Sequence, residues 1–131
     1  MRTLILAAAL LLATGAPAEA SGGWRVARIA PFYGPGLYGR VMACGGILTR
    51  HTRGVASRTA RCGRRIELSW GGRTVITRVV DRGPYPIPSL YAAMPFDLAP
   101  GTSCWDLMPG GRYGHHGCFT KLNVRYRWLG R

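Results

Sequence analysis

The sequence predicts an all-β domain, because glycine and proline interrupt it every few residues and the apolar runs between them are short. It contains 19 glycines and 9 prolines among 131 residues. Runs of this length suit strands better than helices, which need longer stretches with a period of 3.6 residues. The Gly71-Gly72 pair between two such runs is a further signal, because this dipeptide is typical of a tight β-hairpin turn.

The expected strands can be placed in order along the chain. Four stretches show the strand pattern: residues 24–32, 64–70, 73–80 and 122–128. In the second of these, Ile66, Leu68 and Trp70 alternate with polar residues, which predicts one buried side and one side facing solvent. The rest of the core should come from Val75 and Val79 and, in the last strand, from Val124, Tyr126 and Trp128. One short helical turn is expected at residues 89–94, which prolines bracket.

The first twenty residues are expected to be a secretory signal peptide. Arg2 precedes an apolar run, and Ala18-Glu19-Ala20 has the small-x-small pattern of a signal peptidase site. The alternative is an uncleaved membrane anchor, but a run of roughly ten apolar residues is about half of a bilayer span. Residues 21–131 are long enough for one domain with its own core. We therefore expect a secreted, monomeric domain without a membrane span.

The chain has four cysteines, and an even number in an exported protein favours disulfides. Three connectivities are possible. The favoured pairs close short local loops, each worth about 3 kcal/mol in the chain-entropy model: Cys44 with Cys62 and Cys104 with Cys118. The two histidines at 115–116 raise the question of a zinc site, but the spacing matches no common zinc pattern. No metal and no other cofactor is expected.

The charge predicts an anionic partner. The formal net charge is +13, from 18 basic and 5 acidic residues. All basic residues except Lys121 are arginines, whose forked guanidinium groups suit phosphates and other anions. Because they are spread along the whole chain without a nucleic-acid motif, an anionic cell-envelope polymer is expected rather than nucleic acid. The alternative is that the charge serves solubility alone.

The strongest candidate for chemistry is Asp81, which ends the 73–80 strand and begins a turn. Only five acidic residues are available, and Glu19 falls in the expected signal peptide. An acid-dependent mechanism therefore chooses among four carboxylates. The structural alternative is that Asp81 accepts backbone N–H bonds at the turn and pairs with Arg82.

Five short motifs follow one another along the chain: Phe32-Tyr33-Gly34-Pro35-Gly36-Leu37-Tyr38-Gly39-Arg40, Ala43-Cys44-Gly45, Cys62-Gly63, Val80-Asp81-Arg82-Gly83-Pro84-Tyr85 and Phe96-Asp97-Leu98. In this order they resemble the RlpA-like double-psi β-barrel family, from about residue 27 to residue 98 and with the last strand included. The resemblance implies a six-stranded double-psi β-barrel with short helical turns, which the disulfides would stabilise.

That family includes septal lytic transglycosylases, and related barrels occur in expansins and barwin-like proteins that bind or loosen wall polysaccharides. The resemblance implies cleavage of peptidoglycan between N-acetylmuramic acid and N-acetylglucosamine. Asp81 would be the acid/base, and Asp97 resembles the second aspartate of expansin-like barrels. The family glutamate is missing, because Gly46 stands in its place, and the family histidine falls at Ser57. Enzymatic activity is therefore left open, with a non-catalytic wall-binding or wall-loosening module as the alternative.

A lytic transglycosylase needs only one carboxyl group, which protonates the glycosidic oxygen and then accepts the proton of the sugar's 6-hydroxyl. For this role Asp81 must hold a proton, which requires burial or a nearby like charge such as Asp97. Arg78 and Arg82 would oppose it. For Asp97 the structural alternative is a cap of the next turn.

Flat side chains in loop-like segments suggest where a glycan would bind, because sugar rings stack on aromatic faces. Tyr33, Tyr38 and Tyr85 are the expected sugar contacts, together with Arg82, and Trp105 lies in a similar setting. The alternative is that aromatic residues near glycine and proline pack the ends of the barrel.

Overall fold

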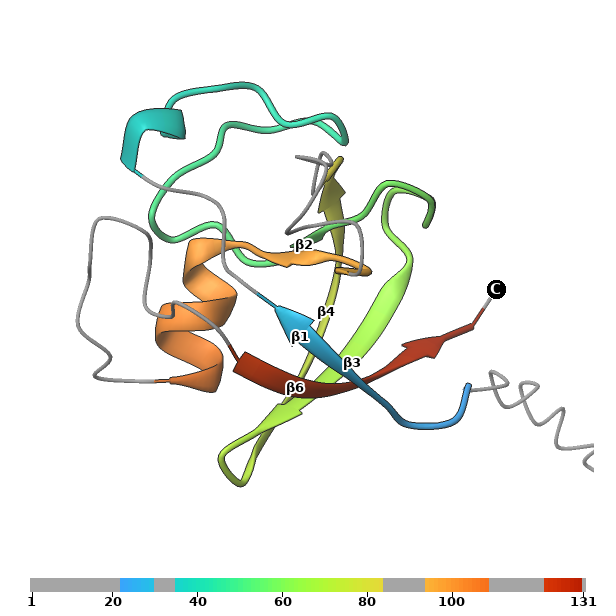
Figure 1. Ribbon diagram of the computed structural model, residues 1–131. Helices are drawn as coiled ribbons and strands as arrows, with labels where there is room; N and C mark the ends of the chain where they lie inside the picture. Colours follow the sequence, from blue (N-terminus) through green and yellow to red (C-terminus); the bar gives the residue numbers. More distant parts are fainter. Residues whose placement is uncertain (1–21, 30–34, 84–93, 109–121, 131) are drawn as a thin grey trace, which may run out of the picture.

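The computed structural model describes residues 22–29, 35–83, 94–108 and 122–130, which form a strongly curled β-sheet (Figure 1). Its six strands are β1 (Arg25–Ile29), β2 (Val55–Ala56), β3 (Arg65–Trp70), β4 (Arg73–Asp81), β5 (Asp97–Leu98) and β6 (Leu122–Leu129). Their spatial order is β1-β6-β3-β4-β2-β5. The described residues also include two short helical elements, the 3-10 turn η1 (Pro35–Leu37) and the π-helix η2 (Thr102–Leu107). The prediction of a six-stranded all-β barrel with short helical turns is confirmed.

The β3–β4 hairpin is the best-predicted part of the fold. The two strands pair antiparallel from Arg65 opposite Arg78 to Trp70 opposite Arg73. Gly71 and Gly72 join them with φ angles of +56° and +76°. A turn with positive φ at both central residues follows the twist of the strands, and glycine adopts it without steric cost.

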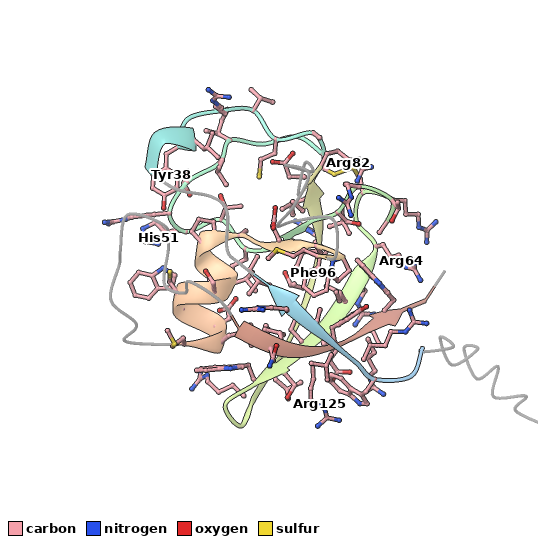
Figure 2. The ribbon with its side chains drawn as sticks, viewed as in Figure 1. Tyr38, His51, Arg64, Arg82, Phe96 and Arg125 are labelled. Atoms are coloured by element: carbon pink, nitrogen blue, oxygen red, sulfur yellow. A yellow bond between two sulfur atoms is a disulfide. The ribbon has the colours of Figure 1, made fainter. Side chains whose placement is uncertain are left out.

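The core fills the concave side of the curl. Ile66 and Leu68 are fully buried, as their alternation with polar residues predicts, and Trp70 is partly buried beside them. Phe96 lies at the centre, with its ring edge-to-face against Tyr126 at a centroid distance of 5.0 Å (Figure 2). The other residues that the sequence assigned to the core also belong to this cluster: Val75, Val79, Val124 and Trp128.

The sequence pattern did not locate two of the six expected strands, β2 and β5, and these decide the architecture around the candidate site. β2 runs parallel to β4 and antiparallel to β5, so it joins the hairpin to the segment at residues 97–98. Each of these strands has two residues, which is too short to display an alternating pattern. The helix η2 was not predicted either. Of the helical turn expected at residues 89–94, all but Met94 lies outside the described residues.

The predicted bond between Cys44 and Cys62 is present, with the two Cα atoms 5.6 Å apart. It ties the loop before β2 to the segment before β3. Such a bond is typical of an oxidising compartment, which fits the expected secretion. The second predicted pair includes Cys118, which lies outside the described residues. Of the helices in the described ranges, none has the length and apolar character to cross a membrane.

Candidate functional site

The fold brings the two predicted catalytic aspartates to opposite sides of β2. Asp81 is the last residue of β4 and Asp97 the first residue of β5, and both are register partners of Ala56. Neighbouring strands lie about 4.8 Å apart, so the two aspartate backbones are separated by roughly 10 Å. The fold thus brings two aspartates that are 16 residues apart in the sequence to the same part of the curled sheet.

Asp81 is held by backbone hydrogen bonds. Its Oδ1 atom accepts the N–H of Ala43 and the N–H of Arg82, each at 2.8 Å. The backbone oxygen of Asp81 accepts the N–H of Ser57 at 3.0 Å. The carboxylate of Asp81 therefore accepts backbone N–H bonds at the turn, as the structural alternative expected. Because Ala43 precedes a disulfide cysteine, Asp81 connects the end of β4 with the cross-linked loop.

Arg82 extends the same scaffold. Its Nη1 atom donates to the backbone oxygens of Ala60 at 2.8 Å and Ser57 at 3.2 Å, and Nη2 lies 3.4 Å from the sulfur of Cys62 (Figure 2). A guanidinium group with these contacts fixes the loop at residues 57–62. Its predicted role in ligand binding stays a prediction.

Asp97 has a different environment. The residue is 3% exposed, and its Oδ1 atom is buried and accepts no hydrogen bond from the described residues. Burial raises the pKa of Asp97 from 3.8 to about 7, and this effect outweighs the positive charge of Arg58, which lowers the pKa. Near neutral pH this carboxyl group therefore carries a proton much of the time. Asp97 does not cap the next helix, because it lies in β5 and the N-cap of η2 is Gly101.

The backbone at Gly46 disfavours the glutamate that the RlpA-like resemblance would place there. Gly46 has a φ of +81° and closes a turn in which its oxygen accepts the N–H of Met42 at 2.9 Å. A glutamate at this position would be strained in that conformation. At the place of the family histidine, Ser57 is buried, and its hydroxyl oxygen accepts the N–H of Ala60 at 3.1 Å. Neither position supplies a second acid or base.

Of the four predicted sugar contacts, Tyr38 and Arg82 lie within the described residues. Tyr38 is half-buried and packs against the small cluster of Leu48 and Ala56, which is the packing role that the sequence left as the alternative. Tyr33 and Tyr85 lie outside the described residues, as do the histidines at 115–116. In the described part of the chain, no group of three or more His, Cys, Asp or Glu residues could hold a metal ion.

An exposed aromatic side chain lies on η2. The ring of Trp105 is stacked on His51, with centroids 5.8 Å apart and an interplanar angle of 27°, and the residue is 45% exposed. An open depression of about 330 Å³ lies beside it, lined by Arg73, Thr74, Val75, Trp105 and Asp106. The sequence indicated Trp105 as an aromatic residue with loop-like neighbours, but it did not predict the helix that presents it.

Comparison with known proteins supports the fold and little more. No protein-family model matches the chain, and no curated protein matches it. Among solved structures, the chain is similar to the Streptomyces papain inhibitor (SPI), with a TM-score of 0.55 and 20% identity. The match covers 88% of this chain and 98% of that one. A likeness at this identity supports the barrel fold, whereas membership of the RlpA-like family stays a prediction.

Proposed function

We propose that this protein cleaves peptidoglycan glycan strands between N-acetylmuramic acid and N-acetylglucosamine, as lytic transglycosylases do, with Asp97 as the acid/base. The observation that carries the proposal is the buried carboxyl group of Asp97, with its pKa near 7 and an Oδ1 atom that accepts no hydrogen bond from the described residues. A general acid works best when its pKa lies near the working pH. A carboxyl group whose pKa is so strongly shifted by burial is also a typical mark of a functional site.

The reaction needs one carboxyl group and no water. Protonated Asp97 gives its proton to the glycosidic oxygen while the bond from that oxygen to the anomeric carbon breaks. The carboxylate then accepts the proton of the sugar's 6-hydroxyl, whose oxygen bonds to the anomeric carbon. The product is a 1,6-anhydro sugar, and the carboxyl group regains its starting form. Asp81 would keep the neighbouring strand end in place through its bonds to Ala43 and Arg82.

A non-catalytic wall-binding or wall-loosening module is the second candidate. Two observations favour it: the backbone at Gly46 disfavours the family glutamate, and Asp97 is only 3% exposed. The papain inhibition in the name of the structural neighbour belongs to that protein. A shared fold at 20% identity does not transfer a binding surface.

Mass spectrometry of the soluble products from purified peptidoglycan tests the proposal. The protein, Asp97→Asn, Asp81→Asn and Asp106→Asn would be incubated with intact sacculi and with glycan strands stripped of stem peptides. Asp106 is the matched control, because it lies in η2 and is ion-paired with Arg53. We expect 1,6-anhydro-muramic acid ends from the protein and from the control, and none from Asp97→Asn.

The two candidates give different results in this experiment. If Asp97→Asn releases as much product as the protein, Asp97 is not the acid. If no protein releases product while all of them still sediment with sacculi, the enzyme proposal fails and the binding module stands. Product release that declines above pH 7 would agree with an acid whose pKa is about 7.

A further inference from the structure

The convex side of the sheet carries a line of arginines that the candidate site does not use. Ile66, Leu68 and Val124 point into the core, so the residues that alternate with them face outward. Five arginines occupy such outward positions, and together we call them the basic face: Arg28 on β1, Arg125 and Arg127 on β6, Arg65 on β3 and Arg78 on β4.

Strand register arranges the basic face as a track along β6. Arg28 is paired with Asn123 at one end, and Arg65 is paired with both Leu129 and Arg78 at the other. Arg125 and Arg127 lie between these ends. Successive outward positions of a strand are about 7 Å apart, so the track from residue 123 to residue 129 extends roughly 20 Å. This geometry suits a linear polymer with regularly repeated negative charge.

The net charge of this surface is strongly positive. Glu67 is the one acidic residue on the outward positions of these paired strands within the described residues, and it is ion-paired with Arg127. Five arginines and one glutamate leave four net positive charges. Arginine binds phosphate with two parallel hydrogen bonds, which makes it better suited to phosphodiesters than a simple point charge is.

Trp24 shapes the chemistry of the track. The guanidinium groups of Arg125 and Arg127 each lie 4.9 Å from the centre of its ring. These contacts hold both arginines in place, which lowers the entropy cost of binding an anion. They also cover part of the ring, although the residue remains 37% exposed, and so leave less of its face for a stacked base. Surfaces that bind single-stranded nucleic acid use free aromatic rings to stack bases. The track therefore favours a phosphate polymer without bases.

We propose that the basic face binds a linear polyol-phosphate polymer of the cell envelope, with poly(glycerol phosphate) as the simplest example. The disulfide between Cys44 and Cys62 supports an envelope partner, because such bonds persist outside the reducing cytosol. Figure 2 places Arg125 on the side of the sheet away from Arg82 and Phe96. This surface is therefore separate from the Asp97 site and does not depend on its activity.

Fluorescence anisotropy with a labelled poly(glycerol phosphate) oligomer, repeated at rising salt, tests this proposal. The first variant combines R28Q, R78Q and R125Q on the basic face. The matched control combines R40Q, R50Q and R61Q, which are exposed arginines of the loops before β3. Both variants lose three positive charges, so the overall charge is matched and the position of the lost charge differs. Circular dichroism checks that each remains folded.

We expect the first variant to bind at least tenfold more weakly than the control. Its slope of log affinity against log salt should also be shallower by about 2, because each lost phosphate contact removes roughly 0.7. The control should stay within threefold of the unmodified protein. Asp97→Asn should bind normally, so a failure of the enzyme proposal would not affect this result.

Three outcomes would overturn the proposal. The first is that the unmodified protein does not bind the oligomer at low salt. Equal weakening of the two triple variants would mean that overall charge, and not the basic face, attracts the polymer. Tighter binding of a single-stranded DNA of equal charge, with the same loss in the first variant, would assign the face to nucleic acid.

Discussion

The ends of β4 and β5 hold two aspartates that share Ala56 as a strand neighbour and differ in nearly everything else. At the end of β4, the Oδ1 atom of Asp81 accepts two backbone N–H bonds, and Arg82 and a disulfide fix the surrounding loop. On β5, Asp97 is buried with an Oδ1 atom that accepts no hydrogen bond from the described residues.

The difference shows how the surroundings assign roles to identical side chains. Hydrogen bonds from backbone N–H groups make a carboxylate part of the scaffold, whereas burial without such bonds favours the protonated form. For this reason we place the acid/base at Asp97 in our proposal, although the sequence pointed first to Asp81. The prominent turn motif around Asp81 indicates a structurally demanding position, which by itself does not identify the acid.

The largest expected effect comes from Asp97→Asn, measured as stability against pH. In the folded protein the carboxyl group of Asp97 has a pKa of about 7, whereas in the unfolded chain its pKa has the ordinary value of 3.8. Between these values the folded state holds the extra proton, so stability falls as pH rises and is constant above about pH 7. The total loss is on the order of 4 kcal/mol. Asparagine does not titrate, so Asp97→Asn does not show this loss. The free energy of unfolding of the variant, relative to that of the unmodified protein, should therefore rise as the pH increases from 4 to 7.

Denaturant unfolding at pH 4, 5.5, 7 and 8 measures this effect. Comparing the difference between the two proteins at each pH cancels the contribution of all other titrating groups. A difference that stays constant from pH 4 to pH 8 would show that the pKa of Asp97 is not raised, and the contrast with Asp81 would lose its basis.

The sequence predicted the parts of the fold that repeat a local pattern. The β3–β4 hairpin could be predicted because Ile66 and Leu68 alternate with polar residues and two glycines form the turn. β2 and β5 could not, because each has two residues and exists only through pairing with distant segments. Their positions depend on tertiary packing, which a local pattern does not encode.

The same limit applies to the candidate site. Asp81 and Asp97 were both predicted, but their different environments depend on the unpredicted strand between them. The local pattern suggested the opposite environment for Asp97, because it lies between Phe96 and Leu98, which are fully buried. Alternation along a strand would place such a carboxylate on the side facing solvent, so the sequence did not indicate the burial that raises its pKa. The strand register around Ala56 is what the sequence lacked.

The next effect tests how firmly the β4 end is held. Replacing Cys44 and Cys62 together by alanine removes a cross-link between residues 18 positions apart. We expect a loss of about 3 kcal/mol in the free energy of unfolding, because the unfolded chain regains the entropy of an open loop. Thermal and denaturant unfolding measure it. The pH dependence assigned to Asp97 should persist in this variant, and its disappearance would mean that the two strand ends are not independent.

A smaller loss is expected from Asp81→Ala. It leaves the N–H groups of Ala43 and Arg82 without their acceptor, which costs about 2 kcal/mol. Asp81→Asn keeps an oxygen acceptor and should cost about half as much, so it serves as the matched control in unfolding at pH 7. Equal losses in both variants would show that the negative charge matters more than the two backbone bonds.

The smallest effect concerns the missing glutamate at Gly46. Gly46→Glu places a side chain on a backbone with φ of +81°, which should cost about 1 kcal/mol, and Gly46→Ala should cost the same. Because the strained turn does not present a carboxylate in a defined position, we expect no increase in product release from peptidoglycan. Restored or stronger cleavage in Gly46→Glu alone would instead place the acid at the turn of residues 42–46, and Asp97 would become the supporting residue.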